Sequence, residues 1–394
     1  MSDKHFHWFL PTSGDGREVI GGLQSAGILG TASAVRPPDL DYLALVARTA
    51  ERLGFESVLT PTGTWCHDAW LTTAALIRET SRLKFLVAFR PGLITPTLAA
   101  QQAATFAEFS GGRLALNIVA GGDREEQQRF GDRLTKEQRY ARAREFVTIV
   151  RQAWTGTPFD FTGDHYDVTG AVVGHPPAVA PQVFFGGASE PAREAAAATV
   201  DTYLTWTEPP EKVAALVDDV RARAARYGRE LSFGIRAHVI TRDTREEAWA
   251  EARKLVGRMD PALIALARER LLQSDSEGQR RQLALNADVD NLEVYPGLWA
   301  GYGLVRPGAG TALVGSHAEV ADLIAQYRAI GIDHFVLSGQ PHIEEAFWFA
   351  EGVAPLVRAA ERRASSDTVA SVVAGADIDV DRFDEGTKGF SATR

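Results

Sequence analysis

A chain of 394 residues and 42.7 kDa exceeds the usual size of one small domain, so its length predicts either two domains or one large α/β barrel. Its hydrophobic content of 45% and charged content of 24% are ordinary for a globular protein that folds in water. The net charge of −9 argues against nucleic acid or an anionic membrane as a partner, and an anionic small substrate would need a local basic pocket.

The sequence also argues against several kinds of site. The single cysteine, Cys66, leaves no partner for an intrachain disulfide and no thiolate set for a metal cluster. Residues Met1–Lys4 lack the apolar core of a signal peptide, and no run of about 18 apolar residues occurs. His5 and His7 have no further ligands at metal-binding spacing, and the Gly-x-Ser-x-Gly elbow is missing. We therefore expect a cytoplasmic enzyme without a metal or a Ser-His-Asp triad.

Strands and helices are predicted to alternate along the chain, with Asp39 a suitable N-cap and Gly54 a suitable stop for the first helix. The predicted strands are His5–Leu10, Phe55–Thr60, Leu83–Phe89, Arg113–Val119, Val183–Phe185, Thr202–Trp206, Leu231–Ile240 and His334–Ser338. The predicted helices are Asp39–Leu53, Ala69–Thr80, Pro96–Phe109, Gln138–Trp154, Glu190–Ala198, Pro210–Tyr227, one from Thr244, Ser316–Ile330 and Ile343–Arg363. A hairpin is predicted over Pro158–Val173.

This count of strand–helix units predicts a (β/α)8 barrel with parallel strands inside and helices outside. A doubly wound open sheet would carry Gly-x-Gly-x-x-Gly after the first strand, and Thr12–Gly16 does not supply it. Long excursions follow the strands: Thr12–Pro38 and Ala120–Glu137 are irregular, and Glu251–Gly310 has helical pieces and a Gly/Pro-flanked segment. They are expected to gather at the carboxyl-terminal face where barrel active sites lie. The barrel is assigned to residues 1–363, and 364–394, which are small, acidic and polar, to a tail.

Arg236 and His238 stand two apart in an otherwise apolar strand, so both side chains are expected to point to one face. Ionisable groups in that position cost free energy unless negative charge lies opposite them. A structural salt bridge would explain one such residue. For a pair near the carboxyl end of a strand, an anion-binding site is the favoured interpretation.

The segment Phe185-Gly186-Gly187-Ala188-Ser189 runs from a strand into a helix. It presents backbone N–H groups and a hydroxyl at a helix N-terminus, which suits a phosphate group. Gly-Gly is also a common tight turn, so the motif is weak by itself. Tyr140, near the start of the helix after the fourth strand, either donates to the same phosphate or only packs its ring.

Four further residues lie where barrel strands end or in the late irregular segment: Cys66, Asn117, Trp206 and Arg306. Each has an ordinary structural explanation as well. Cysteine is a common small packing residue, asparagine caps turns, and tryptophan belongs most often to the core.

Taken together, the residues resemble the flavin-dependent two-component monooxygenases of the bacterial luciferase superfamily, and among them the alkanesulfonate monooxygenases. The resemblance extends from about His7 to Leu356. The matching segments are Trp8-Phe9-Leu10-Pro11-Thr12, Pro61-Thr62-Gly63, Cys66-His67-Asp68-Ala69-Trp70, Leu83-Lys84-Phe85-Leu86-Val87-Ala88, Arg90-Pro91, Gly186-Gly187-Ala188-Ser189, Tyr203-Leu204-Thr205-Trp206, Phe233-Gly234-Ile235-Arg236-Ala237-His238-Val239-Ile240, Leu298-Trp299-Ala300-Gly301, Leu304-Val305-Arg306 and Phe335-Val336-Leu337-Ser338-Gly339 running on to Pro341-His342.

The resemblance implies a (β/α)8 barrel that receives reduced FMN (FMNH2) from a separate NAD(P)H-dependent FMN reductase. With O2 such an enzyme cleaves the C–S bond of a sulfonate, giving sulfite and an aldehyde. It also implies a mobile lid over Gly257–Pro296 and a homodimer or homotetramer. By position it assigns catalytic and sulfonate-binding roles to Arg236, His238, Arg306 and Trp206, a catalytic role to Cys66, and flavin contacts to Asn117, Tyr140, Ala188 and Ser189.

Two departures bear on the substrate. The alkanesulfonate enzymes carry a tyrosine where this chain has Gln340 and a histidine where it has Ser13. A glutamine beside the pocket suits a hydroxylated substrate, so sugar sulfonates such as sulfoquinovose join the simple alkanesulfonates as candidates. Three alternatives remain: a deazaflavin-dependent dehydrogenase, a sulfone-oxidising enzyme, and a flavin-storing relative without catalysis. The last would be expected to lose the polar residues that this chain keeps at its strand ends.

Overall fold

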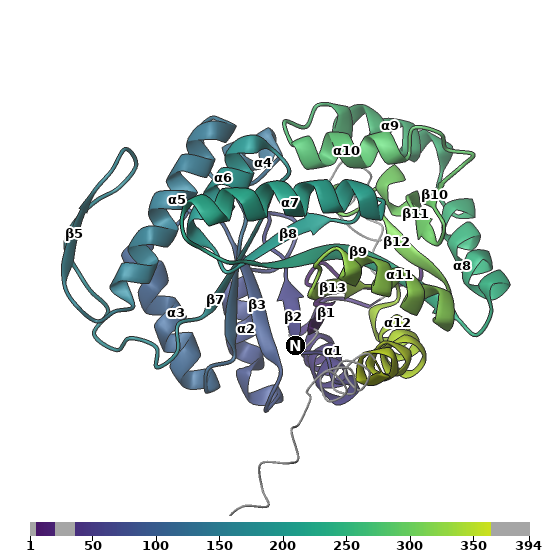
Figure 1. Ribbon diagram of the computed structural model, residues 1–394, viewed down its shortest axis with the longest axis horizontal. Coiled ribbons are helices and arrows are strands. Elements are labelled where there is room, and N and C mark those ends of the chain that lie inside the picture. Colours follow the sequence, from purple (N-terminus) through teal and green to yellow (C-terminus); the bar gives the residue numbers. More distant parts are fainter. Residues whose placement is uncertain (1–4, 20–35, 364–394) are drawn as a thin grey trace, which may run out of the picture.

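The computed structural model describes residues 5–19 and 36–363, and at its centre eight parallel strands form a closed barrel (Figure 1). In order around the barrel the strands are β1 (His5–Phe9), β2 (Ser57–Thr60), β3 (Lys84–Phe89), β4 (Leu114–Ile118), β7 (Gln182–Gly186), β8 (Thr202–Trp206), β9 (Ser232–Arg242) and β13 (His334–Ser338). The pairing of β13 with β1, through His334 and His5, closes the ring. The predicted barrel and its strands are confirmed.

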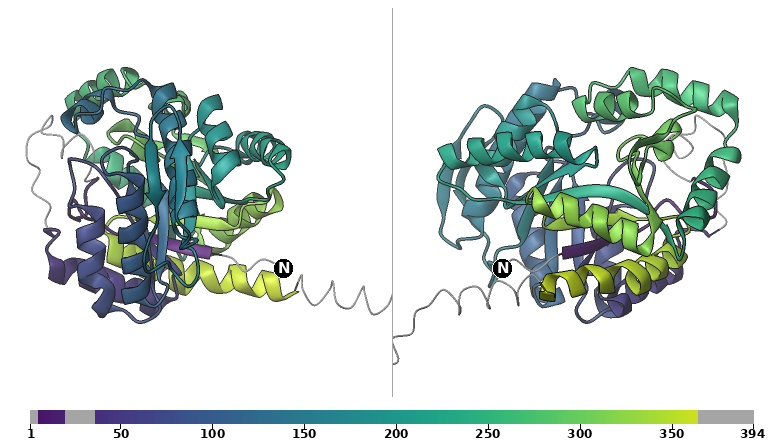
Figure 2. Two further views of the ribbon diagram at one scale, coloured as in Figure 1. Left: turned by 90° about the vertical axis from the view of Figure 1, so that its left-hand side faces the viewer. Right: turned by 45° about the vertical axis from the view of Figure 1, so that its right-hand side comes forward.

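Helices surround the barrel on the outside, as Figure 2 shows from two further directions. They are α1 (Leu40–Leu53), α2 (Ala69–Leu76), α3 (Pro96–Ser110), α5 (Lys136–Ala153), α6 (Glu190–Thr199), α7 (Pro210–Arg226), α11 (His317–Ala329) and α12 (His342–Trp348), and a π-helical turn (Phe349–Val353) leads from α12 into a last helix to residue 363. Asp39 accepts from the Tyr42 backbone N–H and Gly54 ends α1 with φ of 82°, both as predicted. The segment 364–394 lies outside the described residues.

Strand β9 is longer than the barrel needs, and its second half builds a small extra sheet. Residues His238–Arg242 pair in parallel with β12 (Ala312–Ser316), which continues to β11 (Leu298–Trp299) and β10 (Glu293–Tyr295). These strands were not predicted: β10 and β11 have only 3 and 2 residues, and all three strands gain their partners only in the folded chain. The hairpin of β5 (Phe159–Thr162) and β6 (Asp167–Ala171) was predicted and is confirmed. The extra sheet holds the loop that carries Arg306 beside the barrel mouth.

The region after the seventh barrel strand is largely helical, and the helix predicted from Thr244 and the helical pieces predicted beyond it are confirmed. It contains α8 (Arg245–Gly257), α9 (Pro261–Leu272), α10 (Glu277–Leu285) and a 3-10 turn (Gly301–Leu304). We call α9 and α10, which lie at the upper edge of Figure 1, the lid, because residues of both line the cavity at the barrel mouth. Among the described helices, none combines the length and the apolar character that crossing a lipid bilayer requires.

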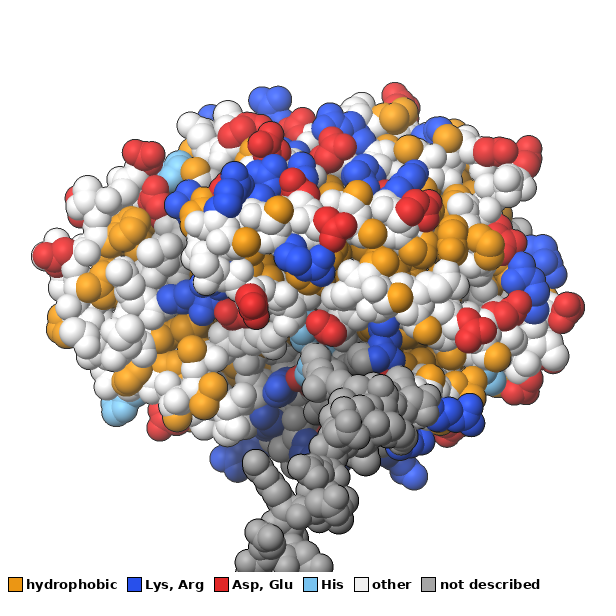
Figure 3. Space-filling model, in the orientation of Figure 1, with side chains coloured by type: hydrophobic (Ala, Val, Ile, Leu, Met, Phe, Trp, Pro, Cys, Tyr) orange, Lys and Arg blue, Asp and Glu red, His pale blue; other side chains and the backbone are white. Residues whose placement is uncertain are grey.

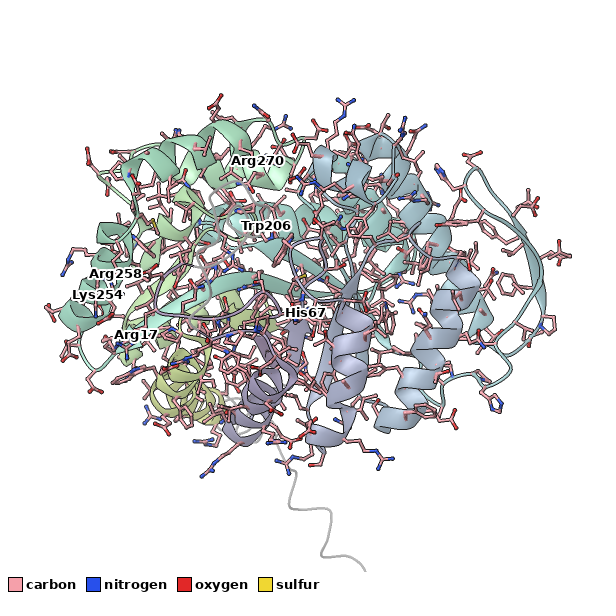
Figure 4. The ribbon with its side chains drawn as sticks, turned by 180° about the vertical axis from the view of Figure 1, so that it is seen from behind. Arg17, His67, Trp206, Lys254, Arg258 and Arg270 are labelled. Carbon is pink, nitrogen blue, oxygen red and sulfur yellow. The ribbon has the colours of Figure 1, made fainter. Side chains whose placement is uncertain are left out.

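Several polar contacts fasten the lid to the loop after β4, which includes α4 (Arg124–Arg129). Arg270 pairs with Glu125 at 2.7 Å, and the Ser274 hydroxyl donates to the Gly122 carbonyl at 3.1 Å. Just before the lid, Arg258 donates to the Arg17 carbonyl at 3.3 Å; both residues are labelled at the edge of the molecule in Figure 4. Basic and acidic side chains are interspersed on the face shown in Figure 3. The contacts of Arg270, Ser274 and Arg258 hold the lid against the neighbouring loops.

Histidines line the amino-terminal end of the barrel, opposite the lid. His7 is buried, with Nε2 3.0 Å from His334 Nδ1 and Nδ1 2.7 Å from the Ser57 hydroxyl. Burial lowers the pKa of His7 to about 4 and that of His334 to about 2. His5 forms a hydrogen bond with Glu56, which raises the pKa of His5, so its shift is opposite to those of His7 and His334.

We expect the protein to lose stability in mild acid because of these histidines. A histidine with a lowered pKa binds fewer protons in the folded state than in the unfolded state below pH 6.5, so stability falls as the pH drops from about 6.5 toward 4, by up to about 1.4 kcal/mol per pH unit for each group. Urea unfolding at pH 7.5, 6 and 5 measures this. A free energy of unfolding that stays constant from pH 7 to pH 5 would contradict it.

Candidate active site

A cavity of about 570 Å³ opens at the carboxyl ends of the barrel strands, beneath the lid. Its volume is typical of small-molecule and cofactor sites. The walls come from β1, β4, β7, β8, β9, the loops after β2, β3 and β4, both lid helices and the loop 306–309. In Figure 4, Trp206 at the end of β8 lies between the lid residue Arg270 and the loop of His67. The segments after β4 and β9 thus meet at the face where the sequence predicted them, whereas most of the predicted segment Thr12–Pro38 lies outside the described residues.

Two guanidinium groups form one wall of the cavity. Arg236 extends from β9 and Arg306 from the loop before β12, and their Cζ atoms lie 5.0 and 5.7 Å from the centre of the Phe9 ring. Arg236 is only 8% exposed and donates to the Ser338 hydroxyl at 2.9 Å and to two backbone carbonyls. Within residues 5–19 and 36–363, neither arginine forms an ion pair with a carboxylate. The wall therefore joins a buried guanidinium, Arg236, to a half-buried one, Arg306, and neither is neutralised by a carboxylate of the described residues.

The cost of burying these two charges is reflected in their lowered pKa values. Burial and the nearby charge of Arg306 lower the pKa of Arg236 to about 9, and burial lowers the pKa of Arg306. A salt bridge would have raised both values. The structural alternative for Arg236, a salt bridge to a neighbouring strand, is thus not what the structure contains, and an anionic ligand would relieve the cost.

His238 lies behind the two arginines and positions Arg236 through the Ser338 hydroxyl. The ring is 1% exposed, stacks on Tyr302 with 3.9 Å between ring centres, and is not part of the cavity lining. Its Nε2 lies 3.2 Å from the Ala309 carbonyl, which can only accept, so Nε2 carries the proton and Nδ1 accepts from the Ser338 hydroxyl at 2.7 Å. A chain of hydrogen bonds thus runs from Arg236 through Ser338 and His238 to Ala309. Burial and the two arginines keep the pKa of His238 well below its usual value, so the ring is neutral.

The glycine-rich segment after β7 forms the other end of the cavity. Ser189 is the N-cap of α6, a helix of 10 residues, and its buried hydroxyl has no hydrogen-bond partner among the described residues. Gly187 has φ of 153°, and a Cβ added there would lie 2.5 Å from the Ala192 Cβ and 3.2 Å from the Tyr140 hydroxyl. Burial raises the pKa of Tyr140, while the neighbouring Ser189 hydroxyl acts in the other direction. A neutral phenol, a free hydroxyl and a helix N-terminus therefore converge there.

The remaining predicted residues divide into two groups. Asn117 on β4, Ala188 and Trp206 line the cavity with the arginines, Tyr140 and Ser189. Cys66 and Gln340 do not line it. The Cys66 sulfur lies 3.7 and 3.6 Å from the Pro61 and Gly63 carbonyls, and burial raises the pKa of its thiol to about 11, so it is protonated near neutral pH. Gln340 is buried after β13 and precedes the cis peptide bond to Pro341.

Sequence reasoning gave no role to two polar residues of the cavity wall. Arg90, at the end of β3, pairs with Glu126 and stacks over Phe130 at 5.2 Å, yet its Nε and Nη1 have no partner among the described residues. Its place directly after a barrel strand was the available signal. Gln279 on α10 also lines the cavity, and nothing in the local sequence distinguishes it from a surface residue of an amphipathic helix.

Comparison with known proteins gives one family and a set of similar folds. Residues 5–334 match the model of the luciferase-like monooxygenase family. Among solved structures, a riboflavin lyase with modified FMN and riboflavin has a TM-score of 0.76 at 19% identity, covering 91% of this chain and 92% of that one. EDTA monooxygenase from Chelativorans sp. BNC1 has a TM-score of 0.70 at 18% identity, covering 91% and 95%. An F420-dependent secondary alcohol dehydrogenase has 0.64 at 18% identity, covering 90% and 99%.

Proposed function

The chain belongs to the luciferase-like monooxygenase family, and from that premise we propose that it is a cytoplasmic two-component sulfonate monooxygenase. It takes FMNH2 from a separate NAD(P)H-dependent FMN reductase and uses O2 to cleave the C–S bond of an alkanesulfonate or a sugar sulfonate such as sulfoquinovose. In the balanced reaction, sulfonate, O2 and FMNH2 give aldehyde, hydrogen sulfite, FMN and water. The observation that carries the proposal is the pairing of buried Arg236 with half-buried Arg306 at one wall of the cavity, without a carboxylate partner among the described residues.

The cavity suits a flavin mononucleotide. The phosphate would be held by the Tyr140 and Ser189 hydroxyls and by the N-terminus of α6. The Ser189 hydroxyl has no hydrogen-bond partner among the described residues and would gain one from the phosphate. Asn117 would contact the flavin from β4, between the phosphate end and the arginine wall. Reduced flavin with O2 supplies the oxidising oxygen when bound. The protein's part is to bind and orient both molecules and to exclude water under the lid.

Arg236 and Arg306 would hold the sulfonate. A sulfonate stays anionic at every physiological pH, and guanidinium donors fit its several oxygens. The chain from Arg236 through Ser338 to His238 fixes the direction of the Arg236 donors, so His238 acts on the substrate through Arg236. Trp206 supplies an apolar wall beside the head group. Cys66 and Gln340 do not line the cavity, so they would act on the site only through the residues that do.

The alternatives differ in cofactor or in the charge of the substrate. A deazaflavin-dependent dehydrogenase would use F420 as its hydride acceptor and no O2; one structural neighbour is named an F420-dependent secondary alcohol dehydrogenase. A sulfone-oxidising enzyme would have no use for two unpaired arginines. Another neighbour is named for EDTA, a polyanion, which accords with an anion site on this fold. We also propose a homodimer or homotetramer, because α2 and α3 expose the large apolar side chains of Leu71 and Phe109.

Sulfite release tests the proposed reaction. The protein is supplied with O2, a flavin reductase and FMN, or with reduced F420 in parallel, and offered ethanesulfonate, octanesulfonate and sulfoquinovose. We expect one sulfite per sulfonate consumed, with FMN only. Equal activity on simple alkanesulfonates without turnover of the sugar would remove the sugar half of the proposal. No sulfite from any member of the panel would overturn the reaction.

The phosphate assignment predicts a loss of flavin affinity when either hydroxyl is removed. Tyr140→Phe and Ser189→Ala are each expected to raise the dissociation constant of reduced FMN about tenfold, since each removes one hydrogen bond to a charged group. Anaerobic fluorescence titration measures this. Tyr166→Phe is the matched control, because that buried hydroxyl has no partner among the described residues and lies outside the cavity lining. An unchanged constant in both test variants would place the phosphate elsewhere.

A further inference from the structure

The lid residue Gln279, which belongs to the cavity lining, carries a buried amide N–H group without an acceptor among the described residues. Its side chain is on α10, 3% exposed, and belongs to the cavity lining. Its Oε1 accepts from the Gly308 backbone N–H at 2.9 Å. A backbone N–H can only donate, so the amide cannot be turned around, and the opposite atom must be Nε2. That Nε2 has no acceptor among the described residues.

The neighbours of Gln279 place this donor at the substrate end of the cavity. Gly308, which its oxygen holds, is two residues from Arg306 in the same loop. The Trp206 ring packs against both segments, since a Cβ added to Gly278 would lie 3.0 Å from it and one added to Gly308 would lie 3.8 Å from it. Gln279 therefore joins Arg306 and Trp206 at one part of the wall, away from the phosphate end at Ser189.

A second glutamine on the same helix shows what a purely structural role looks like. Gln282, less than one turn further on, accepts from the Gly310 N–H at 3.0 Å and donates to the Thr207 carbonyl at 3.1 Å. Both of its polar atoms are used, and it is not part of the cavity lining. Both glutamines hold the loop of Arg306, but Gln279 alone of the two keeps a buried amide N–H group without an acceptor. Such a group is unfavourable until an acceptor arrives.

We propose that Gln279 determines specificity for sulfonates over carboxylates by donating to the third oxygen of the substrate's head group. Arg236 and Arg306 occupy the other two oxygens. A carboxylate offers only two, so it would leave the Gln279 donor unpaired. This rests on the proposed function, since it presumes that the arginine pair binds an organic anion. Because Gln279 belongs to the lid, the same hydrogen bond would also tie the lid to the bound substrate.

Calorimetry on the complex of the protein with FMN tests this, with ethanesulfonate and propanoate as probes. Gln279→Met is expected to weaken ethanesulfonate about tenfold or more, the usual effect of losing a hydrogen bond to a charged group, and to change propanoate by less than threefold. Gln282→Met, the matched control, is expected to lower thermal stability and to leave the ratio of the two affinities unchanged.

Gln279→Glu separates binding from folding. Its carboxylate still accepts from the Gly308 N–H, so a residue with only a structural role would tolerate the change, whereas we expect ethanesulfonate to lose about a hundredfold in affinity. If ethanesulfonate binds the wild type but both Gln279 variants bind it equally well, the role of Gln279 is wrong and the proposed function stands. If the wild type does not bind ethanesulfonate, the proposed function itself fails.

Discussion

Replacing Arg236 with methionine is expected to lower kcat/KM for a sulfonate about a thousandfold while leaving the free energy of unfolding unchanged or higher. The guanidinium donates in a buried site, and losing two or more hydrogen bonds to a desolvated anion accounts for an effect of about 10²–10⁴. Without the anion, however, the same group is a buried charge with a lowered pKa, so removing it relieves a cost that offsets the loss of its hydrogen bonds to Ser338 and two backbone carbonyls. Sulfite release and urea unfolding without substrate measure the two quantities.

A second buried arginine serves as the control. Arg139 is also almost fully buried, but it donates to the carbonyls of Ala120, Gly121 and Leu134 and lies outside the cavity lining. Arg139→Met would leave these carbonyls unpaired, so we expect a loss of stability without a specific loss of sulfonate affinity. The opposite pattern, with Arg236→Met unfolding the protein and the sulfonate still binding to what remains folded, would show that Arg236 is structural.

His238→Phe is expected to lower kcat/KM for the sulfonate about a hundredfold, mainly through KM, and to leave the affinity for reduced FMN unchanged. Phenylalanine keeps the stacking on Tyr302 but breaks the link from Ser338 to Ala309, so Arg236 loses its fixed direction. A milder loss of about tenfold is expected for Ser338→Ala, which removes the Arg236 contact without enlarging the ring site. Steady-state kinetics with a sulfonate and anaerobic FMN titration measure both effects.

The pH dependence distinguishes this positioning role from proton transfer by His238. The pKa of the ring lies well below its usual value, so His238 is neutral at pH 6–9 and contributes no ionisation to kcat/KM in that interval. Tyr302→Phe is the control, because that buried hydroxyl has no partner among the described residues and the ring stack is kept. An ionisation near pH 7 that disappears in His238→Phe would mean that the ring carries a proton during the reaction.

The barrel was predictable because its strands are contiguous apolar segments whose composition is independent of their neighbours. Asp39 and Gly54 likewise marked the ends of α1 through local chemistry alone. Strands β10, β11 and β12 were not predictable, since segments such as Leu298–Trp299 become strands only through pairing with the second half of β9. Helix α5 begins at Lys136, two residues before its predicted start, because Thr135 forms a capping box with Gln138.

The site was predictable in its location and less so in its details. Arg236, Asn117 and Trp206 were expected to converge because they lie near the carboxyl ends of barrel strands, and all three line one cavity. That position did not separate residues that face the cavity from those one layer behind, such as His238 and Cys66, since that depends on strand tilt and on which hydrogen bonds are already made. Gln279 was not predicted for the same reason. Only its hydrogen bond to the Gly308 N–H reveals that its Nε2 has no acceptor among the described residues.

The central claim is that the arginine wall requires a negatively charged ligand. Its most direct measurement is the affinity of the FMN complex of the wild-type protein for ethanesulfonate and for ethyl methyl sulfone, two molecules of similar size that differ in charge. We expect the sulfonate to bind at least about a hundredfold more tightly, since only it replaces the missing counter-charge of Arg236 and Arg306. Equal binding of the neutral sulfone would contradict the account.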